Sequence, residues 1–316
     1  VLFRSTRLHT GWVQGEEVRC IYHGWKFAAN GQCTEAPAEG PETAAKIRVV
    51  SYPVHEYAGL LFAYLGEGAA PAFDLPRKPD FEKPGLLVIA RAQVWPTNFF
   101  QMIENSLDAV HVSFVHLAGK VGPFGEAVTA NIPTLEYFET EAGVRQIARR
   151  GADNPRTSDW SFPNNNHIVT PGRTKASPWV HRGVWNTPID DTHTAKIGVY
   201  AIQSEGPEKD AETLAHFDRH GDYNPAHHHD ALFSGEGWPS DPSLELTPAQ
   251  DYVAMMGQGS IADRAHERLG KSDAGIVLLR RIFWREIEAM RMGAPTKVWR
   301  RLEDGVELKR QGGAAS

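Results

Sequence analysis

Cysteine is scarce in this chain, which has 2 cysteines among 316 residues. Two thiols cannot build the disulfide framework on which many small secreted domains depend. Long apolar runs are missing as well, since the longest, such as residues 59–65, have the length of a β-strand and are too short to span a bilayer. No signal peptide is visible. We therefore expect a cytoplasmic protein without a membrane-spanning segment.

The net charge of the chain is small as well. The formal net charge of −6 argues against non-specific binding of nucleic acid and against binding to anionic membranes. The chain does have length and apolar content. Its 316 residues suggest about two domains, and a hydrophobic fraction of 41% with 9 tryptophans is ample for sizeable cores.

Proline and alanine mark the predicted domain boundary. Residues 66–84 contain four prolines, which is typical of a linker. We expect a β-rich first domain over 1–66, a linker over 67–84 and a second domain over 85–316. In the first domain, Gln14-Gly15-Glu16 and Ala29–Gln32 predict hairpin turns.

The second domain shows strand and helix patterns on both sides of a segment, from Lys120 to about Gly183, that is predicted to be loop-rich with scattered strands. We expect a strand over 86–94, a helix over 98–110 and a strand hairpin formed by 180–185 and 195–203. A last helix begins at Ser272 and ends at Gly293, with apolar residues at intervals of three and four.

Residues 105–116 carry the most informative motif, Asn-x2-Asp-x2-His-x4-His. On a helix, Asp108 and His111 are three residues apart and share a face, so Asp108 is placed to accept a hydrogen bond from the outer N–H of His111. His116 would point away from His111 on a straight helix. Both imidazoles can bind one metal ion only if the helix ends or unwinds between them, near Ser113-Phe114.

The alternative to a metal site is that these two histidines occur at this spacing by chance. A buried histidine usually belongs to the core, and two histidines five residues apart arise by chance fairly often. Asn105 and Asp108 at their spacings tip the balance towards a metal site, with Asn105 orienting a ligand and not binding the metal itself. Two neutral histidines plus one carboxylate form the facial arrangement that suits non-haem Fe(II).

The remaining ligand should be a carboxylate, for which Asp251 is the best candidate. Thr247 suits an N-cap and Pro248 a first helical position, which places Asp251 in the first turn with its side chain able to face the core. Asp263 is the rival, although an ion pair with the neighbouring Arg264 would also explain it.

Other polar clusters receive structural interpretations. Asn98 is either a helix cap or a wall of the active site, and we favour the cap. The segment 162–169 either lines a pocket or forms an Asn-rich turn, and the turn is the simpler account. The segment 187–194, which contains Asp190, is read as a hairpin turn. The tandem His227–His229 could bind metal, but tandem histidines in a polar loop more often face solvent.

Cys20-Ile-Tyr-His23-Gly-Trp-Lys-Phe resembles the second half of a Rieske motif, in which two cysteines hold one iron of a [2Fe–2S] cluster and two histidines hold the other. The upstream Cys-x-His should fall at positions 1 and 3, where Val and Phe stand. We expect an N-terminally truncated gene whose first five residues are read-through from a sequencing adapter, and a cluster that cannot assemble in this chain. Cys33 fits no Rieske spacing and is read as a structural thiol.

Together with Pro188–Thr194 and the Gln250-Asp251 and Gln258-Gly259 pairs, these motifs resemble the Rieske non-haem iron oxygenases, in particular the oxygenase (alpha) subunits of the phthalate 4,5-dioxygenase type. The resemblance implies an α+β chain with a truncated all-β Rieske domain and a helix-grip catalytic domain, an antiparallel sheet around a long helix. It implies mononuclear Fe(II) on His111, His116 and Asp251, and half of a [2Fe–2S] cluster on Cys20 and His23.

The resemblance also implies partners and a reaction. Oxygenase subunits of this class usually form trimers, in which Asp108 would bridge the His23 imidazole of one subunit and His111 of its neighbour. An NAD(P)H-dependent reductase would supply electrons, and O2 would be used to hydroxylate or O-demethylate an aromatic, carboxylate-bearing substrate. Replacing Asp108 by Ala should leave iron bound and uncouple electron delivery. The choice between dihydroxylation, monooxygenation and demethylation stays open.

Two accounts from other functional classes compete with this one. The same His111, His116 and Asp251 would serve a zinc hydrolase, for which bound zinc without dependence on O2 would speak. A catalytically incomplete helix-grip domain that only binds ligands is the other account. Tight binding of an aromatic molecule without iron would support it.

Overall fold

The computed structural model describes residues 2–3, 6–70, 78–116, 131–151, 155–172 and 177–300 of the chain. It divides into two compact units, Val1–Phe73 and Asp74–Ser316. This division lies inside the segment 67–84 for which a linker is predicted. Each unit is described by itself below.

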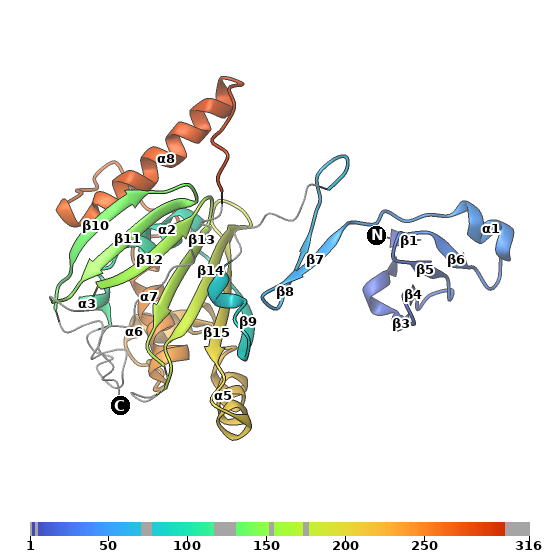
Figure 1. The fold of residues 1–316 in the computed structure, drawn as a ribbon, viewed down its shortest axis with the longest axis horizontal. Helices are drawn as coiled ribbons and strands as arrows, with labels where there is room; N and C mark the ends of the chain where they lie inside the picture. Colours follow the sequence, from blue (N-terminus) through green and yellow to red (C-terminus); the bar gives the residue numbers. More distant parts are fainter. Residues whose placement is uncertain are drawn as a thin grey trace. The chain divides into compact units, whose positions relative to one another are not determined.

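The first unit is built of short antiparallel strands (Figure 1). Two of its sheets are two-stranded, and one has the order β3-β4-β5-β6. The elements are β1 (Leu2–Phe3), β2 (Thr6–Arg7), η1 (Leu8–Thr10), β3 (Trp12–Gln14), β4 (Glu17–Arg19), β5 (Lys26–Ala28), β6 (Cys33–Glu35), α1 (Pro41–Lys46), β7 (Val54–Tyr57) and β8 (Leu60–Ala63). The two predicted hairpin turns are confirmed between β3 and β4 and between β5 and β6.

A small apolar core holds the four-stranded sheet together. Trp25, Phe27 and Cys33 are buried against alanines of the segment that follows β6. The thiol of Cys33 donates a hydrogen bond to the carbonyl oxygen of Glu35 at 3.3 Å, and burial raises its pKa. These contacts agree with the structural role expected for this cysteine.

A seven-stranded antiparallel sheet forms the second unit, in the order β10-β11-β12-β13-β14-β15-β9. Its strands are β9 (Leu86–Trp95), β10 (Thr134–Glu139), β11 (Gly143–Arg149), β12 (Pro155–Ser161), β13 (Asn165–Thr170), β14 (Val180–Pro188) and β15 (Thr194–Gln203). The predicted hairpin is confirmed as β14 and β15, which pair from His181 with Ala201 to Pro188 with Thr194.

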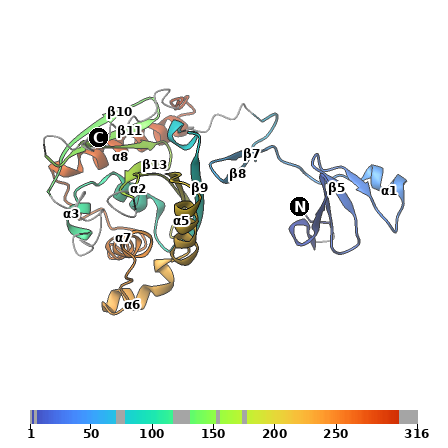
Figure 2. The ribbon, with the colours of Figure 1, turned by 60° about the horizontal axis from the view of Figure 1, so that its bottom comes forward.

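The α-helices cover one face of this sheet (Figure 2), whereas the short helical turn Pro79–Phe81 packs on the other face, against His167 and Gly183. The helical elements are η2 (Pro79–Phe81), α2 (Phe99–Leu107), α3 (Val112–Val115), α5 (Pro207–His220), η4 (Pro225–His228), α6 (His229–Ser234), η5 (the π-helix Pro242–Leu246), α7 (Thr247–Met256), η6 (Lys271–Asp273) and α8 (Ala274–Arg291). Within the described part of the chain, no helix has both the length and the apolarity that a membrane span requires. The expected α+β architecture, a sheet with a long helix against it, is confirmed.

The largest core cluster joins α2 and α8 to the sheet. Ile103 and Leu107 of α2 pack with Leu279 of α8 against Val144 and Trp160 of the sheet, and all five side chains are almost fully buried. Burying each such side chain stabilises the fold by about 1.5–3 kcal/mol. This cluster therefore fixes α2, and with it the residues that follow the end of α2, against the sheet.

Several local expectations need correction. The helix that carries the iron motif ends at Leu107, not near Ser113-Phe114, because Asp108 takes an extended conformation with φ −88° and ψ 103°. Thr247 is no N-cap, since a π-helix runs directly into α7 and Asp241 caps that earlier segment instead. The turn is limited to residues 162–164, and Asn165–Thr170 is a strand from which Asn166 and Ile168 line a cavity, as the alternative interpretation predicts. By contrast, Asn98 caps α2 as expected.

Glu104 links three segments of the second unit by ion pairs. It lies on α2 with 9% of its surface exposed, and its carboxylate is 2.7 Å from Arg280 on α8 and 2.8 Å from Arg264. Because the carboxylate is largely removed from water, its two charged partners matter more than those of a surface pair.

We expect Glu104→Gln to lower the free energy of unfolding by about 1.5–3 kcal/mol, since two hydrogen bonds between charged groups are weakened at a largely buried position. Glu288→Gln serves as the control, because Glu288 and Arg291 form an exposed pair within α8. That change should cost less than about 0.5 kcal/mol. Denaturant unfolding of both variants measures the difference, and equal losses would contradict the assigned role of Glu104.

Candidate metal centre

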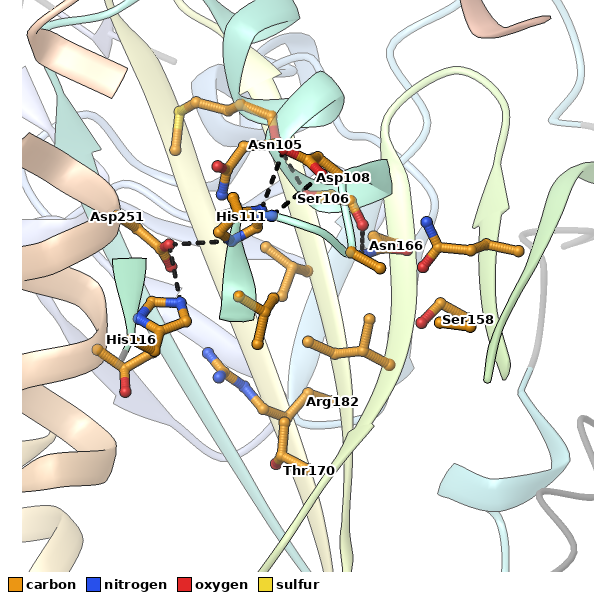
Figure 3. A pocket seen from close by; sticks show the side chains of 18 of the residues that line it. Asn105, Ser106, Asp108, His111, His116, Ser158, Asn166, Thr170, Arg182 and Asp251 are labelled. Carbon is orange, nitrogen blue, oxygen red and sulfur yellow. Dashed lines mark hydrogen bonds and ion pairs between the residues drawn. The ribbon is translucent and has the colours of Figure 1, made fainter. Parts of the chain in front are cut away.

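Three side chains from two short helical segments converge beyond the end of α2 (Figure 3). His111 and His116 flank α3, and Asp251 comes from α7. Each offers one ligand atom, and the three atoms lie within 4.8 Å of one another. The Oδ1 atom of Asp251 is 3.5 Å from Nε2 of His111 and 3.2 Å from Nε2 of His116.

The donor atoms fit a metal ion. Asp251 Oδ1 is buried and accepts no hydrogen bond among the residues that the structure describes, although two imidazole nitrogens stand beside it. Ligand atoms on one ion, each bound at about 2.1 Å, lie about 3.0–3.4 Å apart. Two imidazoles and one carboxylate that leave further positions open form the set that suits non-haem Fe(II).

Gln250 fixes the orientation of one of these imidazoles. Its Oε1 atom lies 3.0 Å from Nδ1 of His116. An amide oxygen only accepts hydrogen bonds, so Nδ1 carries the proton and Nε2 turns its lone pair towards Asp251. Gln250 stands next to Asp251 on α7, and the same turn of helix thus supplies one candidate ligand and orients another.

Charges at the centre are strongly coupled. Burial alone raises the pKa of Asp251, but the imidazoles of His116 and His111 outweigh it and hold that pKa well below its usual value. Burial lowers the pKa of His111, whereas the carboxylates of Asp108 and Asp251 raise it, with a net result of about 9. The electrostatic field of the two carboxylates therefore favours a cation at this place.

Side chains from the sheet and from Arg150 donate hydrogen bonds to the backbone carbonyl groups at and after the end of α2. Gln146 and Tyr137 donate hydrogen bonds to the carbonyl oxygen of Leu107, the latter at 3.2 Å. Arg150 donates to the carbonyl of Ala109 at 2.8 Å, and Asn166 to that of Ser106 at 3.3 Å. The last carbonyls of a helix lack partners within it. Here the sheet supplies those partners, so the chain can leave the helix before His111.

Asp108 caps the turn that carries His111. Its Oδ1 atom accepts hydrogen bonds from the backbone N–H groups of Val110 at 2.8 Å and of His111 at 3.2 Å. Its Oδ2 atom is 3.6 Å from Nδ1 of His111, which is within reach of an ion pair and longer than a hydrogen bond. Asn105 lines the same cavity beside His111 (Figure 3).

A cavity between the sheet and the helices opens from the His/His/Asp group. Strand register places the sheet residues that line it on the helix-facing side, because Gln146 pairs with Ser158 and Asn166 pairs with Val184. Its polar and charged lining comprises Asn105, Ser106, Asp108, His111, His116, Gln146, Arg150, Arg156, Ser158, Asn166, Thr170, Arg182, Asn186, Lys196, Thr247 and Asp251.

Three arginines make one wall of this cavity cationic. Arg150 follows β11, while Arg156 and Arg182 lie on β12 and β14. Among the described residues, none of them pairs with a carboxylate, and the Nε atom of each is buried without a hydrogen bond. Burial, together with Arg150 and Arg182, lowers the pKa of Arg156 to about 10, so Arg156 stays charged at neutral pH.

The rival metal-site candidates lie elsewhere. Asp263 is exposed and pairs with His266 at 3.2 Å, not with Arg264. His229 of the tandem histidines contacts the Tyr252 hydroxyl at 2.9 Å, and in the described part of the chain the tandem residues join no metal-ligating group. Asp190 contacts His193 at 3.0 Å inside the hairpin turn, as its structural interpretation requires.

Sequence reasoning overlooked the arginine wall and Gln250. Arg150, Arg156 and Arg182 stand 6 and 26 residues apart in the chain and come together only through strand pairing. Period-2 alternation within β12 and β14 could have assigned Arg156 and Arg182 to a common face. Nothing in the sequence signals that this face also faces the metal-ligating group.

In the first unit, Cys20 and His23 lie on the loop between β4 and β5. The backbone N–H of Cys20 bonds the Trp25 carbonyl at 2.8 Å, and that of Gly24 bonds the Cys20 carbonyl at 3.1 Å. Cys20 is 1% exposed, whereas His23 is exposed. These are two of the four ligands that a Rieske cluster requires. Val1 lies outside the described residues and Phe3 has no ligating atom, so the residues present do not complete that cluster.

Comparison with known proteins agrees with these observations. The Rieske [2Fe-2S] domain family matches residues 3–56. The 5,5'-dehydrodivanillate O-demethylase oxygenase subunit of Sphingobium sp. is 31% identical over 93% of this chain and 66% of its own length. For the phthalate 4,5-dioxygenase oxygenase subunit of Pseudomonas putida, these values are 28%, 92% and 71%. The chain thus spans about two thirds of the length of these relatives.

Solved structures show the same fold. NdmA of Pseudomonas putida CBB5, as the QL mutant with caffeine, matches with a TM-score of 0.63 and 20% identity, over 98% of this chain and 83% of its own. Dicamba monooxygenase bound to dicamba matches with a TM-score of 0.57 and 15% identity, over 90% and 84%. From its Rieske domain match and its curated relatives, the chain belongs to the Rieske non-haem iron oxygenases and is related to the oxygenase subunits of phthalate 4,5-dioxygenase type.

Proposed function

We propose that this chain is the oxygenase component of a Rieske-type system that hydroxylates or O-demethylates an aromatic carboxylate with O2 and externally supplied electrons. The observation that carries the proposal is the convergence of His111, His116 and Asp251 in a cavity that is also lined by three arginines, none of which pairs with a carboxylate of the described residues. The relatives named above are an O-demethylase and dioxygenase subunits, which supports this reaction class.

In this proposal the protein's residues bind and orient. His111, His116 and Asp251 would hold a mononuclear Fe(II), which supplies the reductive activation of O2. Gln250 keeps the His116 lone pair directed at the centre, and Asp108 holds the turn that carries His111. Cys20 and His23 would contribute half of a Rieske cluster, for which the other half is not present in this sequence.

The arginine wall selects the substrate. A carboxylate placed against Arg156 would accept charge-assisted hydrogen bonds in a site shielded from water, where such bonds are strong. Ile168 and Val184 add apolar surface to the lining of the same cavity, which suits an aromatic ring. A substrate held by its carboxylate would thus present its far side to the iron.

The family relationship also suggests the partners of this subunit. We propose that a separate reductase or ferredoxin delivers the electrons, ultimately from NAD(P)H, and that the full-length subunit assembles as a homotrimer. In that assembly Asp108 would stand between His111 and the cluster of the neighbouring subunit. Its half-exposed position, with 33% of the side chain accessible, leaves it able to meet a partner chain.

The metal assignment predicts the effect of Asp251→Asn. We expect anaerobic equilibrium dialysis to show about one Fe(II) per wild-type chain and at least a tenfold weaker affinity for the variant, because a neutral amide oxygen replaces the carboxylate ligand. Asp263→Asn, at the exposed rival acid, should bind iron as the wild type does. Unchanged iron binding in Asp251→Asn would overturn the assignment, and a preference for zinc without any consumption of O2 would favour a hydrolase.

The substrate assignment predicts the effect of Arg156→Gln. For the probe pair 4-methoxybenzoate and 4-methoxybenzamide, we expect calorimetry to show at least tenfold tighter binding of the anion by the wild type, as one charge-assisted hydrogen bond contributes about 1.5–3 kcal/mol. Arg156→Gln should remove most of this preference. Arg149→Gln is the control, since Arg149 pairs with Glu136 at 3.1 Å outside the cavity. Equal affinity of the wild type for both probes would contradict the assignment.

A further inference from the structure

A second group of metal-ligating side chains lies between α5 and the π-helix η5, apart from the cavity described above. His216 and His220 are four residues apart on α5, so both imidazoles lie on one face of that helix. Asp241 caps η5, and Glu245 lies within it. Two imidazoles on one segment therefore meet two carboxylates on another.

The distances resemble those of the proposed iron centre. Nε2 of His216 is 3.5 Å from Oδ2 of Asp241. One ligand atom each from His216, His220 and Asp241 lie within 4.8 Å of one another. The ligand atoms of a tetrahedral zinc ion, bound at about 2.0–2.1 Å, lie about 3.3 Å apart. The distance between His216 and Asp241 is therefore within a few tenths of an ångström of the separation that one ion requires.

The two oxygen atoms of the Asp241 carboxylate make different contacts. Its Oδ1 atom accepts hydrogen bonds from the backbone N–H groups of Ser243 at 3.1 Å and Leu244 at 2.8 Å. Its Oδ2 atom faces His216. The N-cap thus holds the carboxylate in place, and the oxygen directed at His216 is positioned before any ion binds.

Glu245 supports His220 in the manner of an outer-shell carboxylate. Its Oε1 atom is 2.7 Å from Nδ1 of His220. A carboxylate accepts this hydrogen bond, so the proton resides on Nδ1 and the lone pair on Nε2 remains for a metal ion. Ligating histidines in metalloproteins usually donate their second N–H to such an acceptor.

The group is shielded from water although it lies near the surface. The exposed fractions of the side chains are 12% for His216, 11% for Asp241, 18% for Glu245 and 30% for His220. Phe217 and Leu244, their chain neighbours, are buried in a core cluster with Ile89 and Ile202. Histidines in a mobile polar loop would not be held in this way.

We propose that His216, His220 and Asp241 bind a structural Zn²⁺ ion, with Glu245 orienting His220 and a water completing the coordination. Two imidazole nitrogens and one carboxylate oxygen are donors that zinc accepts in a four-coordinate site. The ion would join α5 to η5. Since η5 runs directly into α7, it would also brace the helix that presents Asp251.

Zinc counting with the full chain tests this proposal. After removal of metals with a chelator, the protein is dialysed against Zn²⁺, and zinc is counted by mass spectrometry. We expect two ions per wild-type chain, one for Asp251→Asn, one for Asp241→Asn and none for the double variant. Asn caps helices about as well as Asp, so Asp241→Asn should remove the ligand charge and leave η5 in place. The two centres are thereby counted separately.

Thermal unfolding provides the second measurement. In the Asp251→Asn background, Zn²⁺ should raise the melting temperature, because an ion that binds only the folded state stabilises it. Adding Asp241→Asn should abolish that rise, and adding Glu245→Gln should weaken zinc binding by about 10–100-fold. The control adds His227→Gln, at an exposed histidine of the tandem run, and should leave both readouts unchanged.

Two outcomes would overturn the proposal. Zinc that persists in the Asp241→Asn/Asp251→Asn double variant and disappears with His227→Gln would be adventitious binding by surface histidines. No zinc bound by Asp251→Asn would reduce the group to a pair of ion pairs between α5 and η5. Either result leaves the proposed iron centre at Asp251 unaffected, because zinc binding at that centre is measured separately in the Asp241→Asn variant.

Discussion

The interruption of the polypeptide helix after Leu107 is the constraint on which the candidate active site depends. The backbone carbonyl groups at this point are buried, and a buried carbonyl without a partner is costly. Side chains of the sheet provide the partners, among them Gln146, Arg150 and Asn166. The segment that follows can then turn, and His111 and His116 reach the same carboxylate although five residues separate them.

The cavity is lined by groups of opposite charge that come from two layers of the fold. Asp108 and Asp251 come from the helical layer and favour a cation, whereas Arg156 and Arg182 come from the strands and favour an anion. Among the described residues, no ion pair joins these arginines to Asp108 or Asp251, although Lys196 of β15 also lines the cavity and interacts electrostatically with Asp251. An anionic aromatic molecule and a divalent metal ion would each complement one of these two sets of charges.

Features that depend on neighbouring residues can be predicted from this sequence, whereas contacts between distant segments cannot. The cap at Asn98 and the antiparallel hairpin over 180–203 follow from short-range rules, and both were predicted. The predicted position of the helix break is wrong. Hydrogen bonds from Gln146 of β11, Arg150 and Asn166 of β13 determine where the helix ends, and no residue near the break in the sequence indicates these partners. Thr247 was a misleading cap for a similar reason, since the preceding π-helix runs into α7 without an interruption.

Ligand geometry alone does not make a metal site, as a third group shows. Asp80, His167 and His181 also bring three ligand atoms within 4.8 Å. Yet Lys83 lies 2.5 Å from Asp80, and burial together with the charge of Lys78 lowers the pKa of His167 far below its usual value. Two ammonium groups already supply the positive charge that an ion would bring, and His167 and His181 lie 3.2 Å apart, within hydrogen-bonding distance of each other. The ion pairs therefore separate this structural cluster from the group around Asp251, where Asp108 lies beside His111 and no lysine or arginine of the described residues forms an ion pair with Asp251.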